Sequence, residues 1–556
     1  MDTNIRICGE AGQGVQTTGD LLTHALAAAG LHVCATQGYM SRIRGGVNSF
    51  DVRIGDAEVL GARVPAELLV VFTREALDNC RSSVAEGGLV LFDGQADDGV
   101  IALEMAKAAA AAGGSALMAN AVAAGAVYAL LGLDLGSLRA ALSKQFAKKD
   151  ESVARTNIAC AEKGAELVAA RRGAVKCPKP GQPFGAVVSG SETVGLAAAV
   201  AGVKVVSSYP MTPSTGVFTW LAGAADRYGI VVEQAEDEIA AINMVCGATY
   251  AGVPAMTTTS GGGFALMAEG LSLAGMCELP AVILLSQRPA PATGLPTRTG
   301  QEDLLFAAHA GHGEFPRAIF APGSLAQAYD LTRRAFETAH RWQTPAMILI
   351  DQFLADLQRN VAPMDETLRP IDRGLLDVPP ADYRRYAVTK NGVSPRAIPG
   401  AGPFVITDSD EHTADGHLTE DLAVRVEQQD KRLRKCKGML AEFLLPEFYP
   451  APAAEVLACW GSTWGPCREA VDLLRAAGRD VCMLHFGQVW PIDGRRVKPM
   501  VAGRKVTMVE GNATAQLGSV LKGAGALGRF KAILRYDGLP FTGPEIAERA
   551  AGRVKS

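Results

Sequence analysis

The feature that most constrains the fold is a repeated unit of apolar strand, glycine-rich or hydroxyl-rich loop, and helix. Residues 4–30 begin with it: an apolar run (NIRIC), a glycine loop (GEAGQG) and a helical stretch (VQTTGDLLTHALAAAG). Runs typical of buried strands recur at LHVCATQ, ELLVVFT and GLVLFD. Strands that alternate with helices predict an α/β fold with mostly parallel, doubly wound sheets.

The same pattern returns twice, which predicts several domains. A chain of 556 residues is expected to form roughly three to five domains. The run RRGAVKCPKPGQPFG is typical of a linker, and a proline-rich, charged stretch after the second pattern predicts an extended or partly helical connector. We predict three doubly wound domains at residues 1–174, 186–357 and 453–556, a linker at 175–185 and a connector at 358–452.

Composition narrows the class of protein. The chain is 48% hydrophobic and 20% charged with a formal net charge of −4, which gives no support for binding nucleic acid or a membrane surface. Its eleven cysteines include no CxxC pair, which favours a reducing compartment without disulfides. Because the amino terminus is polar and does not resemble a signal peptide, we expect a cytoplasmic location.

One uncharged stretch is long enough to cross a bilayer. Residues 108–133 (AAAAAGGSALMANAVAAGAVYALLGL) are mostly alanine and are interrupted by two glycines and by Asn120. This composition favours a buried helix pair, or a strand followed by a helix, over a membrane span.

The segment YPMTPST places a threonine between two prolines. Pro210 and Pro213 fix their own φ angles and restrict the residues before them, so Thr212 has little backbone freedom. One interpretation is that its hydroxyl is aimed at a ligand. The alternative is a proline-rich turn followed by a hydroxyl helix cap.

Three acids precede a nearly charge-free helix. Glu236, Asp237 and Glu238 stand before IAAINMVCGATYAG, where the helix dipole stabilises negative charge. One acid is expected to face inward, where burial would perturb its ionisation and suit it to proton chemistry. The later run TTTSGGGF places hydroxyls and glycines at a strand end, where open α/β sheets bind ligands.

Two arginines follow the strand PAVILLSQ. Arg288 at the strand end could hold a substrate carboxylate through two hydrogen bonds, or could form a structural salt bridge; Arg298 lies farther along the loop. In SRIRGG near the amino terminus, Arg42 and Arg44 could bind an anionic ligand or a neighbouring subunit, or form a surface ion pair.

The loop GEAGQG could cradle a phosphate at a helix amino terminus, or could be a tight turn without a ligand. Its spacing is GxxGxG rather than GxGxxG, and no acidic residue ends the second strand to hold a ribose. Both features disfavour a nicotinamide-dependent dehydrogenase.

Four motifs in order, YPMTPST, EDEIAAINMVCGATYAG, TTTSGGGFALMAEG and QRPAPATGLPTRTGQEDL, resemble the α subunit of 2-oxoacid:ferredoxin oxidoreductases. The amino-terminal GEAGQG, YMSRIRGG and VRI are similar to that family's γ segment, here fused ahead of α. The segments DEHTADGHLTED, KRLRK and WGSTWGPCREAV are similar to its connector and last domain. The two-subunit type, 2-oxoglutarate:ferredoxin oxidoreductase, fits best.

The resemblance implies oxidative decarboxylation of 2-oxoglutarate with coenzyme A to succinyl-CoA, carbon dioxide and reduced ferredoxin, or the reverse carboxylation of a reductive tricarboxylic acid cycle. It implies a γ-like domain, a thiamine-pyrimidine-binding domain and a transketolase carboxy-terminal-like domain. Pyruvate, branched-chain or aryl 2-oxoacids are alternative substrates, and a non-catalytic scaffold subunit is an alternative function.

The resemblance also assigns roles to residues. Glu238 matches the glutamate that bonds the aminopyrimidine ring of thiamine diphosphate, and Thr212 and Arg288 match the residues that hold the 2-oxoacid, so these three are the predicted catalytic residues. Arg298 is a candidate for the second carboxylate of 2-oxoglutarate. Four further residues are predicted to contact the cofactor: Tyr209, Pro210, Ser260 and Gly261. Gly12, Gly14 and Arg44 are predicted to contact coenzyme A or another subunit.

Two motifs that the chemistry needs are absent from the sequence. There is no GDG motif for binding the diphosphate through Mg²⁺, and no run of cysteine ligands for a cluster. The resemblance therefore implies a partner β subunit that carries the Mg²⁺–diphosphate site and a [4Fe-4S] cluster, an (αβ)2 assembly and ferredoxin as electron carrier. We expect no metal site, no nucleic acid and no membrane, and activity only with the β subunit.

Overall fold

The computed structural model describes residues 1–41, 46–95 and 97–553. The chain forms two compact units. The first comprises Met1–Ser189 and Asp356–Met364, and the second comprises Gly190–Ala355 and Asp365–Ser556.

The first unit contains an eight-stranded sheet in the order β6-β5-β4-β1-β3-β2-β14-β7. Its strands are β1 (Asp2–Glu10), β2 (His32–Gly38), β3 (Val47–Gly55), β4 (Ala66–Val71), β5 (Val84–Phe92), β6 (Ile101–Ala102), β7 (Ala186–Ser189) and β14 (Gln358–Val361). Strands β6, β5, β4 and β1 run parallel, whereas β3, β2, β14 and β7 follow with antiparallel pairings.

This sheet is mixed, so the prediction of a mostly parallel sheet is wrong for the first unit. Strands β2 and β3 are consecutive in the chain and pair antiparallel, so the connection between them needs no crossover helix. The parallel half is built as predicted, with helices between its strands. The first strand, glycine loop and helix lie where the sequence places them.

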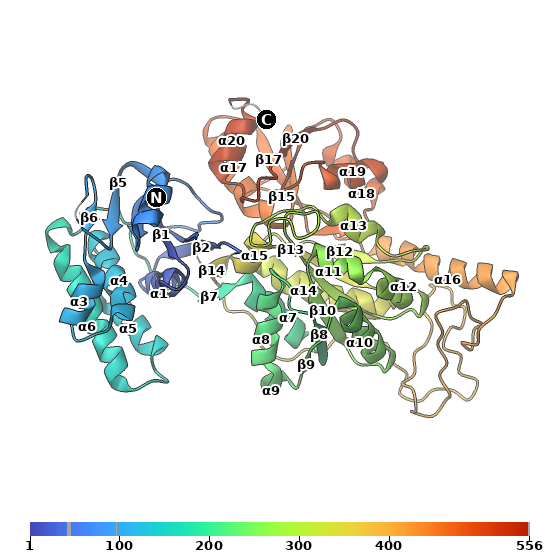
Figure 1. Ribbon diagram of the computed structural model, residues 1–556. Coiled ribbons are helices and arrows are strands. Elements are labelled where there is room, and N and C mark those ends of the chain that lie inside the picture. The colour runs from blue at the N-terminus through green and yellow to red at the C-terminus, as the bar shows by residue number, and fades with distance from the viewer. Residues whose placement is uncertain (42–45, 96, 554–556) are drawn as a thin grey trace. The chain divides into compact units, whose positions relative to one another are not determined.

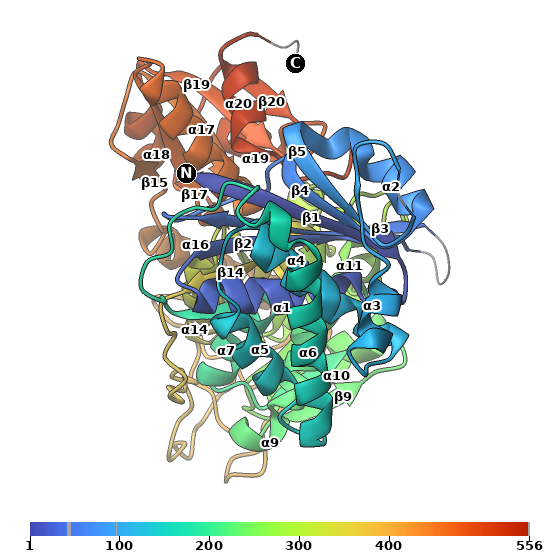
Figure 2. The ribbon, with the colours of Figure 1, turned by 90° about the vertical axis from the view of Figure 1, so that its left-hand side faces the viewer.

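Helices cover both faces of the first sheet. They are α1 (Val15–Ala28), α2 (Arg74–Cys80), α3 (Met105–Ala111), α4 (Ala119–Leu130), α5 (Gly136–Gln145) and α6 (Glu151–Leu167). Ile5 and Ile7 of β1 pack on the face covered by α1 and α3–α6, whereas Cys8 packs on the face covered by α2. Figure 2 shows this division, with α2 apart from the other five helices.

The alanine-rich stretch at 108–133 folds as a buried helix pair, as the sequence favoured. Helix α4 crosses α6 so closely that a Cβ on Gly125 would lie 1.8 Å from the Ala161 carbonyl oxygen. Among the described residues, none of the helices is by itself long and apolar enough to cross a membrane. The segments Met105–Ala111 and Ala116–Leu130 reach that length and apolar character only when they are taken together, and they meet at a 112° bend.

The second unit contains a seven-stranded sheet in the order β18-β12-β13-β11-β10-β8-β9 (Figure 1). Its strands are β8 (Val205–Ser208), β9 (Val231–Gln234), β10 (Ala255–Thr259), β11 (Val282–Gln287), β12 (Ala318–Phe320), β13 (Ala346–Asp351) and β18 (Gln488–Trp490). All pairs are parallel except that of β18 with β12. Its helices are α7 (Gly190–Val200), α8 (Thr215–Gly223), α9 (Ala225–Tyr228), α10 (Glu238–Tyr250), α11 (Gly261–Leu266), α12 (Ala268–Met276), α13 (Leu304–His309), α14 (Leu325–Trp342) and α15 (Gln352–Asp356).

A five-stranded sheet completes the second unit, in the order β15-β17-β16-β19-β20. Its strands are β15 (Glu447–Tyr449), β16 (Glu455–Trp460), β17 (Val481–Phe486), β19 (Lys505–Glu510) and β20 (Lys531–Leu534), with helices α17 (Trp464–Ala476), α18 (Gly494–Val501), α19 (Gln516–Gly523) and α20 (Gly543–Ala550). One hydrophobic core joins this sheet to the preceding one, from Ile283 and Met347 to Trp460 and Phe486.

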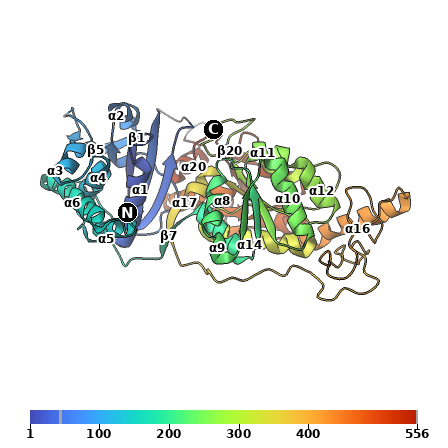
Figure 3. The ribbon, with the colours of Figure 1, turned by 60° about the horizontal axis from the view of Figure 1, so that its bottom comes forward.

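The segment predicted as a connector holds the single long helix α16 (Leu422–Ala441) after a stretch with little regular structure (Figure 3). Two buried ion pairs join this helix to Glu278. Lys431 Nζ lies 2.7 Å from Glu278 Oε1, and Lys435 Nζ lies 2.5 Å from Glu278 Oε2, with all three side chains buried. Burial raises the pKa of Glu278, but Lys435, Lys431 and Arg385 lower it further, so the carboxylate stays ionised.

Three short strands pair across the predicted segments: β7, at the start of the predicted second domain, and β14 and β15, within the predicted connector. Strand β14 (Gln358–Val361) and strand β7 (Ala186–Ser189) pair with each other and complete the first sheet. Strand β15 (Glu447–Tyr449) pairs with β17. Short edge strands far apart in sequence carry little periodicity of their own, and tertiary pairing determines them.

We predict that Glu278→Gln destabilises the second unit by about 3–5 kcal/mol, because it leaves two buried ammonium groups without a counter-charge. Chemical denaturation, followed by hydrogen exchange in α16, measures the change. The matched control is Glu366→Gln, whose partner Arg227 forms an ion pair exposed on both sides. That control should change stability by at most about 1 kcal/mol. Equal effects of the two substitutions would contradict the anchoring role.

Candidate functional site

The candidate site lies at one edge of the seven-stranded sheet. Four adjacent parallel strands, β11, β10, β8 and β9, end there at Gln287, Thr259, Ser208 and Gln234. Each predicted catalytic residue follows one of these ends within a few residues. Because parallel strands share the direction of their carboxyl ends, the topology brings together segments far apart in sequence.

Arg288 and Thr212 contact each other across this edge. Arg288 follows β11 directly, and its Nη1 donates a hydrogen bond of 2.7 Å to the Thr212 carbonyl oxygen. The arginine is buried, and burial lowers the pKa of its guanidinium while Asp303 raises it. Thr212 is half-buried, and its peptide bond to Pro213 is cis. The arginine thus ties the YPMTPST loop to the end of β11.

Glu238 is the inward-facing acid of the three at the start of α10. Asp237 caps the helix, accepting a hydrogen bond of 2.7 Å from the Ala240 amide, and Glu236 is exposed. The Glu238 side chain is only 3% exposed, and within the described part of the chain Oε1 has no hydrogen-bond partner. Such a group is costly to bury, which marks a position that a donor from a ligand would satisfy.

Glycines make room for the two buried acids of the site. A Cβ on Gly263 would lie 2.2 Å from Glu238 Oε1, and one on Gly261 would lie 2.6 Å from both carboxyl oxygens of Asp303. Ser260 is fully buried between β10 and α11, and no described residue pairs with its hydroxyl. The TTTSGGGF motif therefore lies directly against both carboxylates.

The remaining predicted residues lie farther from this cluster. Tyr209 is exposed and Pro210 half-buried, at the start of the loop that carries Thr212. Arg298 is half-buried, and the stem of its side chain lies against Gly538 of the last domain. In the described structure, only Thr212 has a hydrogen bond to Arg288, and Arg298 is not part of that contact.

Comparisons with known proteins identify the family of the chain. The thiamine diphosphate-binding model of pyruvate flavodoxin/ferredoxin oxidoreductases matches residues 196–431, and a second model, pyruvate ferredoxin/flavodoxin oxidoreductase, matches residues 4–167. The Aeropyrum pernix protein named 2-oxoacid:ferredoxin oxidoreductase 2, subunit alpha, is 30% identical over 98% of this chain and 97% of its own. The chain belongs to the family of 2-oxoacid:ferredoxin oxidoreductase α subunits.

Other relatives extend the comparison. The Mycobacterium tuberculosis 2-oxoglutarate oxidoreductase subunit KorA is 28% identical over 98% of this α subunit and 90% of its own length. A solved structure, described as 2-oxoglutarate:ferredoxin oxidoreductase from Magnetococcus marinus with 2-oxoglutarate, coenzyme A and succinyl-CoA bound, is 30% identical, with a TM-score of 0.92 and full coverage of both chains. These matches confirm the predicted α/β fold and the γ-like segment fused ahead of the α part.

The glycine loop of the α subunit lies in the first unit. Gly12 and Gly14 have φ angles of 90° and 74°, in the left-handed region that favours glycine. They line a hollow of about 430 Å³ that also includes Gln37, Tyr39 and Asn48. Of the arginines predicted beside this loop, Arg42 and Arg44 lie outside the described residues.

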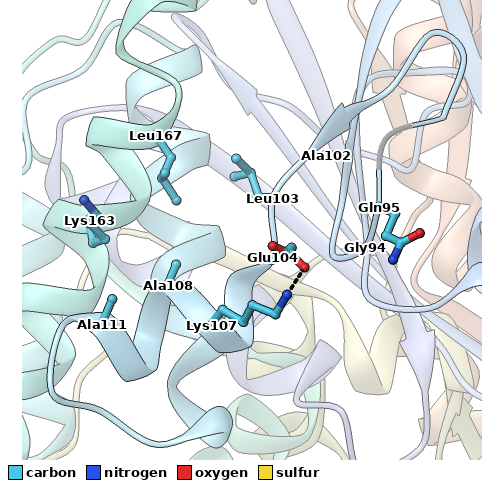
Figure 4. Close-up of a pocket in the computed structure, with 10 residues that line it drawn as sticks. All are labelled: Gly94, Gln95, Ala102, Leu103, Glu104, Lys107, Ala108, Ala111, Lys163 and Leu167. Carbon is cyan, nitrogen blue, oxygen red and sulfur yellow. Dashed lines mark hydrogen bonds and ion pairs between the residues drawn. The ribbon is translucent and has the colours of Figure 1, made fainter.

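A second hollow of the same unit, about 620 Å³, lies between the ends of β5 and β6 and helices α3 and α6 (Figure 4). Both lysines that line it are paired. Lys107 contacts Glu104, and Lys163 Nζ lies 2.9 Å from Glu166 Oε1. The paired charges make this hollow a weaker candidate for an anionic ligand than the glycine loop.

The sequence analysis missed Asp303 at the main site. Asp303 is 6% exposed, and among the described residues its Oδ2 lacks a hydrogen-bond partner. Burial and Glu302 raise the pKa of Asp303 to about 7, while Arg288 lowers it. The sequence signal for Asp303 was an acid just before an apolar helix, and such an acid is also typical of a helix cap. In the structure, the Asp303 side chain forms no capping hydrogen bond to α13.

A second missed contact joins this sheet to the last domain. Asp351 ends β13, is buried, and accepts hydrogen bonds from the Ser462 hydroxyl and, at 2.9 Å, from the Leu354 amide. Burial raises the pKa of Asp351 to about 6. Because Ser462 belongs to a segment far from Asp351 in the chain, no local pattern could have indicated the contact between them.

We predict that Asp303→Asn stabilises the protein more at about pH 8 than at about pH 5, by a difference of roughly 2 kcal/mol. Since the folded pKa of Asp303 is raised to about 7, the stability that the protonated side chain contributes is fully present below about pH 4 and is lost progressively as the pH rises to about 7. Asparagine has no proton to lose. The free energy of unfolding at both pH values measures the effect.

The exposed Asp382 supplies a matched control. Asp382→Asn should change stability by the same small amount at both pH values. A pH-independent effect of Asp303→Asn would show that the carboxyl group is not held protonated by its surroundings.

Proposed function

We propose that this α subunit oxidatively decarboxylates 2-oxoglutarate with coenzyme A, giving succinyl-CoA, carbon dioxide and reduced ferredoxin, or catalyses the reverse carboxylation. The observation that carries the proposal is the buried Glu238 carboxylate, whose Oε1 has no partner among the described residues. The choice of 2-oxoglutarate rests on the names of the M. tuberculosis relative and the M. marinus structure. Pyruvate, branched-chain and aryl 2-oxoacids are the alternatives.

The residues at the site fit thiamine diphosphate. Glu238 offers a desolvated acceptor to a ring nitrogen, and Gly263 leaves that carboxylate uncovered. Ser260 and Gly261 precede Gly263 in the same strand–helix turn, and Tyr209 and Pro210 begin the loop that carries Thr212. When bound, thiamine diphosphate supplies the electron sink for loss of carbon dioxide from a 2-oxoacid.

The substrate side of the site is formed by Thr212 and Arg288. Arg288 uses one hydrogen bond to fix the loop, and the guanidinium carries further donors for a substrate carboxylate. Since the loop between two prolines is already fixed, the Thr212 hydroxyl can bind the 2-oxo group with little ordering cost. Arg298, farther along the loop that begins with Arg288, is the candidate for the distal carboxylate.

A β subunit is proposed to complete the site with a Mg²⁺-bound diphosphate and a [4Fe-4S] cluster, because the sequence holds neither a GDG motif nor cysteine ligands. Four apolar side chains on α10, α11 and α13 are 38–50% exposed beside the site: Ile239, Met244, Leu266 and Phe306. Such exposed groups fit a covering partner. We propose an (αβ)2 complex in the cytoplasm with ferredoxin as acceptor, and coenzyme A bound near Gly12 and Gly14.

We predict that Glu238→Gln in the αβ complex abolishes reduction of a viologen acceptor while leaving assembly intact. The amide keeps the shape of the side chain but cannot hold a negative charge against a ring nitrogen. Glu236→Gln, two residues earlier and exposed, is the matched control and should retain wild-type turnover. Unchanged turnover in Glu238→Gln would favour the alternative of a non-catalytic scaffold subunit.

A substrate panel distinguishes 2-oxoglutarate from the other 2-oxoacids. The complex should turn over 2-oxoglutarate faster than 2-oxobutyrate, and Arg298→Gln should lower kcat/KM for 2-oxoglutarate by roughly 10- to 100-fold, as loss of a charge-assisted hydrogen bond does. The same variant should leave 2-oxobutyrate unaffected, since that acid lacks a second carboxylate. Equal rates with both acids in the wild type would remove the assignment.

A further inference from the structure

Two thiols meet on the α2 face of the first sheet. Cys8 lies on β1 and Cys80 is the last residue of α2, and Cys80 packs against the small core that contains Cys8. Both pack in one small core between α2 and the sheet, with Leu69 and Val71 of β4. Cys8 is fully buried, whereas Cys80 is half-buried, so Cys80 is the sulfur that a small solute reaches first.

A cation lies beside this pair. Arg6 precedes Cys8 by two residues on the same face of β1 and interacts with both sulfurs. Its own partner is Asp51 of β3, with Arg6 Nε 2.8 Å from Asp51 Oδ1. The interaction with Cys8 and the charge of Arg6 lower the pKa of the Cys80 thiol, against the opposing effects of burial and Asp51.

The two thiols of the pair therefore differ in acidity. The interaction with Cys80 and burial raise the pKa of the Cys8 thiol, whereas the pKa of Cys80 is lowered, so Cys80 is the more acidic thiol of the pair. A half-buried cysteine of lowered pKa, next to an arginine and a second thiol, is in the setting in which cysteines react with oxidants.

We propose that Cys80 is a modification site for peroxide-class oxidants and that Cys8 is its resolving thiol. The Cys80 thiolate attacks one peroxide oxygen and the O–O bond breaks; the leaving hydroxide takes a proton to become water, and the sulfur becomes a sulfenic acid. The Cys8 sulfur then attacks the Cys80 sulfur and displaces hydroxide, which leaves as water with the proton of Cys8. In total, two thiols lose two electrons and two protons, and one peroxide becomes two waters.

The position of the pair gives the modification a local consequence. Cys8 is followed directly by Gly9 and the glycine loop, which lines the hollow of about 430 Å³. A disulfide would tie the carboxyl end of α2 to β1 at the start of that loop. This inference is independent of the proposed substrate and of the site around Glu238.

The chain offers two internal controls. Cys177 has the same half-buried exposure as Cys80 in the same unit, but burial raises its pKa to about 11. Cys459 and Cys467 also contact each other, but both are fully buried in the last domain. Neither control combines a second thiol, a cation and access to solvent.

The first test measures alkylation by iodoacetamide in the folded, full-length wild-type chain at about pH 7, with peptide mapping by mass spectrometry. Cys80 should be modified at least about tenfold faster than Cys177, because its thiolate fraction is larger. No variant is needed, so misfolding cannot obscure the result. Equal rates at Cys80 and Cys177 would overturn the assignment of Cys80 as the reactive thiol.

The second test treats the full-length chain with hydrogen peroxide. The wild type should form a Cys8–Cys80 disulfide that a reducing thiol reverses, while Cys459 and Cys467 stay reduced. Cys8→Ser should instead accumulate a sulfenic acid at Cys80 that a dimedone probe traps, and Cys80→Ser should form neither product. Absence of both the disulfide in the wild type and the trapped sulfenic acid in Cys8→Ser would overturn the proposal.

Discussion

The site in the second unit depends on one constraint: a glutamate is buried at the start of a helix, and no described residue gives its Oε1 a hydrogen bond. Glu238 begins α10, and its Oε1 faces Gly263 of the neighbouring strand–helix turn. Leaving such a group unpaired costs about 1–3 kcal/mol, and more if it is charged. A fold keeps this kind of arrangement where a ligand supplies the missing donor, so the buried acid indicates a binding site more strongly than any hollow does.

The parallel sheet explains why the other site residues gather near that carboxylate. Strands β8, β9, β10 and β11 end at one edge, and each is followed by a segment that carries a candidate side chain. Arg288 then ties two of these segments together through the Thr212 carbonyl. Two of the three glycines after β10 are needed for steric reasons. A side chain at Gly261 would overlap the Asp303 carboxyl group, and one at Gly263 would overlap that of Glu238.

The sequence predicted the parts of this site that are local. Short local patterns indicated the strand ends, the acids before α10 and the arginine after β11. Of the acids, the sequence favoured Glu238 over Glu236 as the inward-facing one, and in the structure Glu238 is buried and Glu236 is exposed. Asp303 was missed because its pattern is also that of a helix cap. The pairing of β14 with β7, and that of Asp351 with Ser462, join segments far apart in the chain, so no periodicity could predict them.

The central claim is that the Glu238 carboxylate is the acceptor for the pyrimidine ring of thiamine diphosphate. An experimental structure of the αβ complex with bound thiamine diphosphate tests it most directly. The account predicts a Glu238 carboxylate oxygen about 2.6–2.9 Å from a ring nitrogen, the range of a charge-assisted hydrogen bond. A Glu238 side chain turned to solvent, or a ring held by other residues at this edge of the sheet, would contradict it.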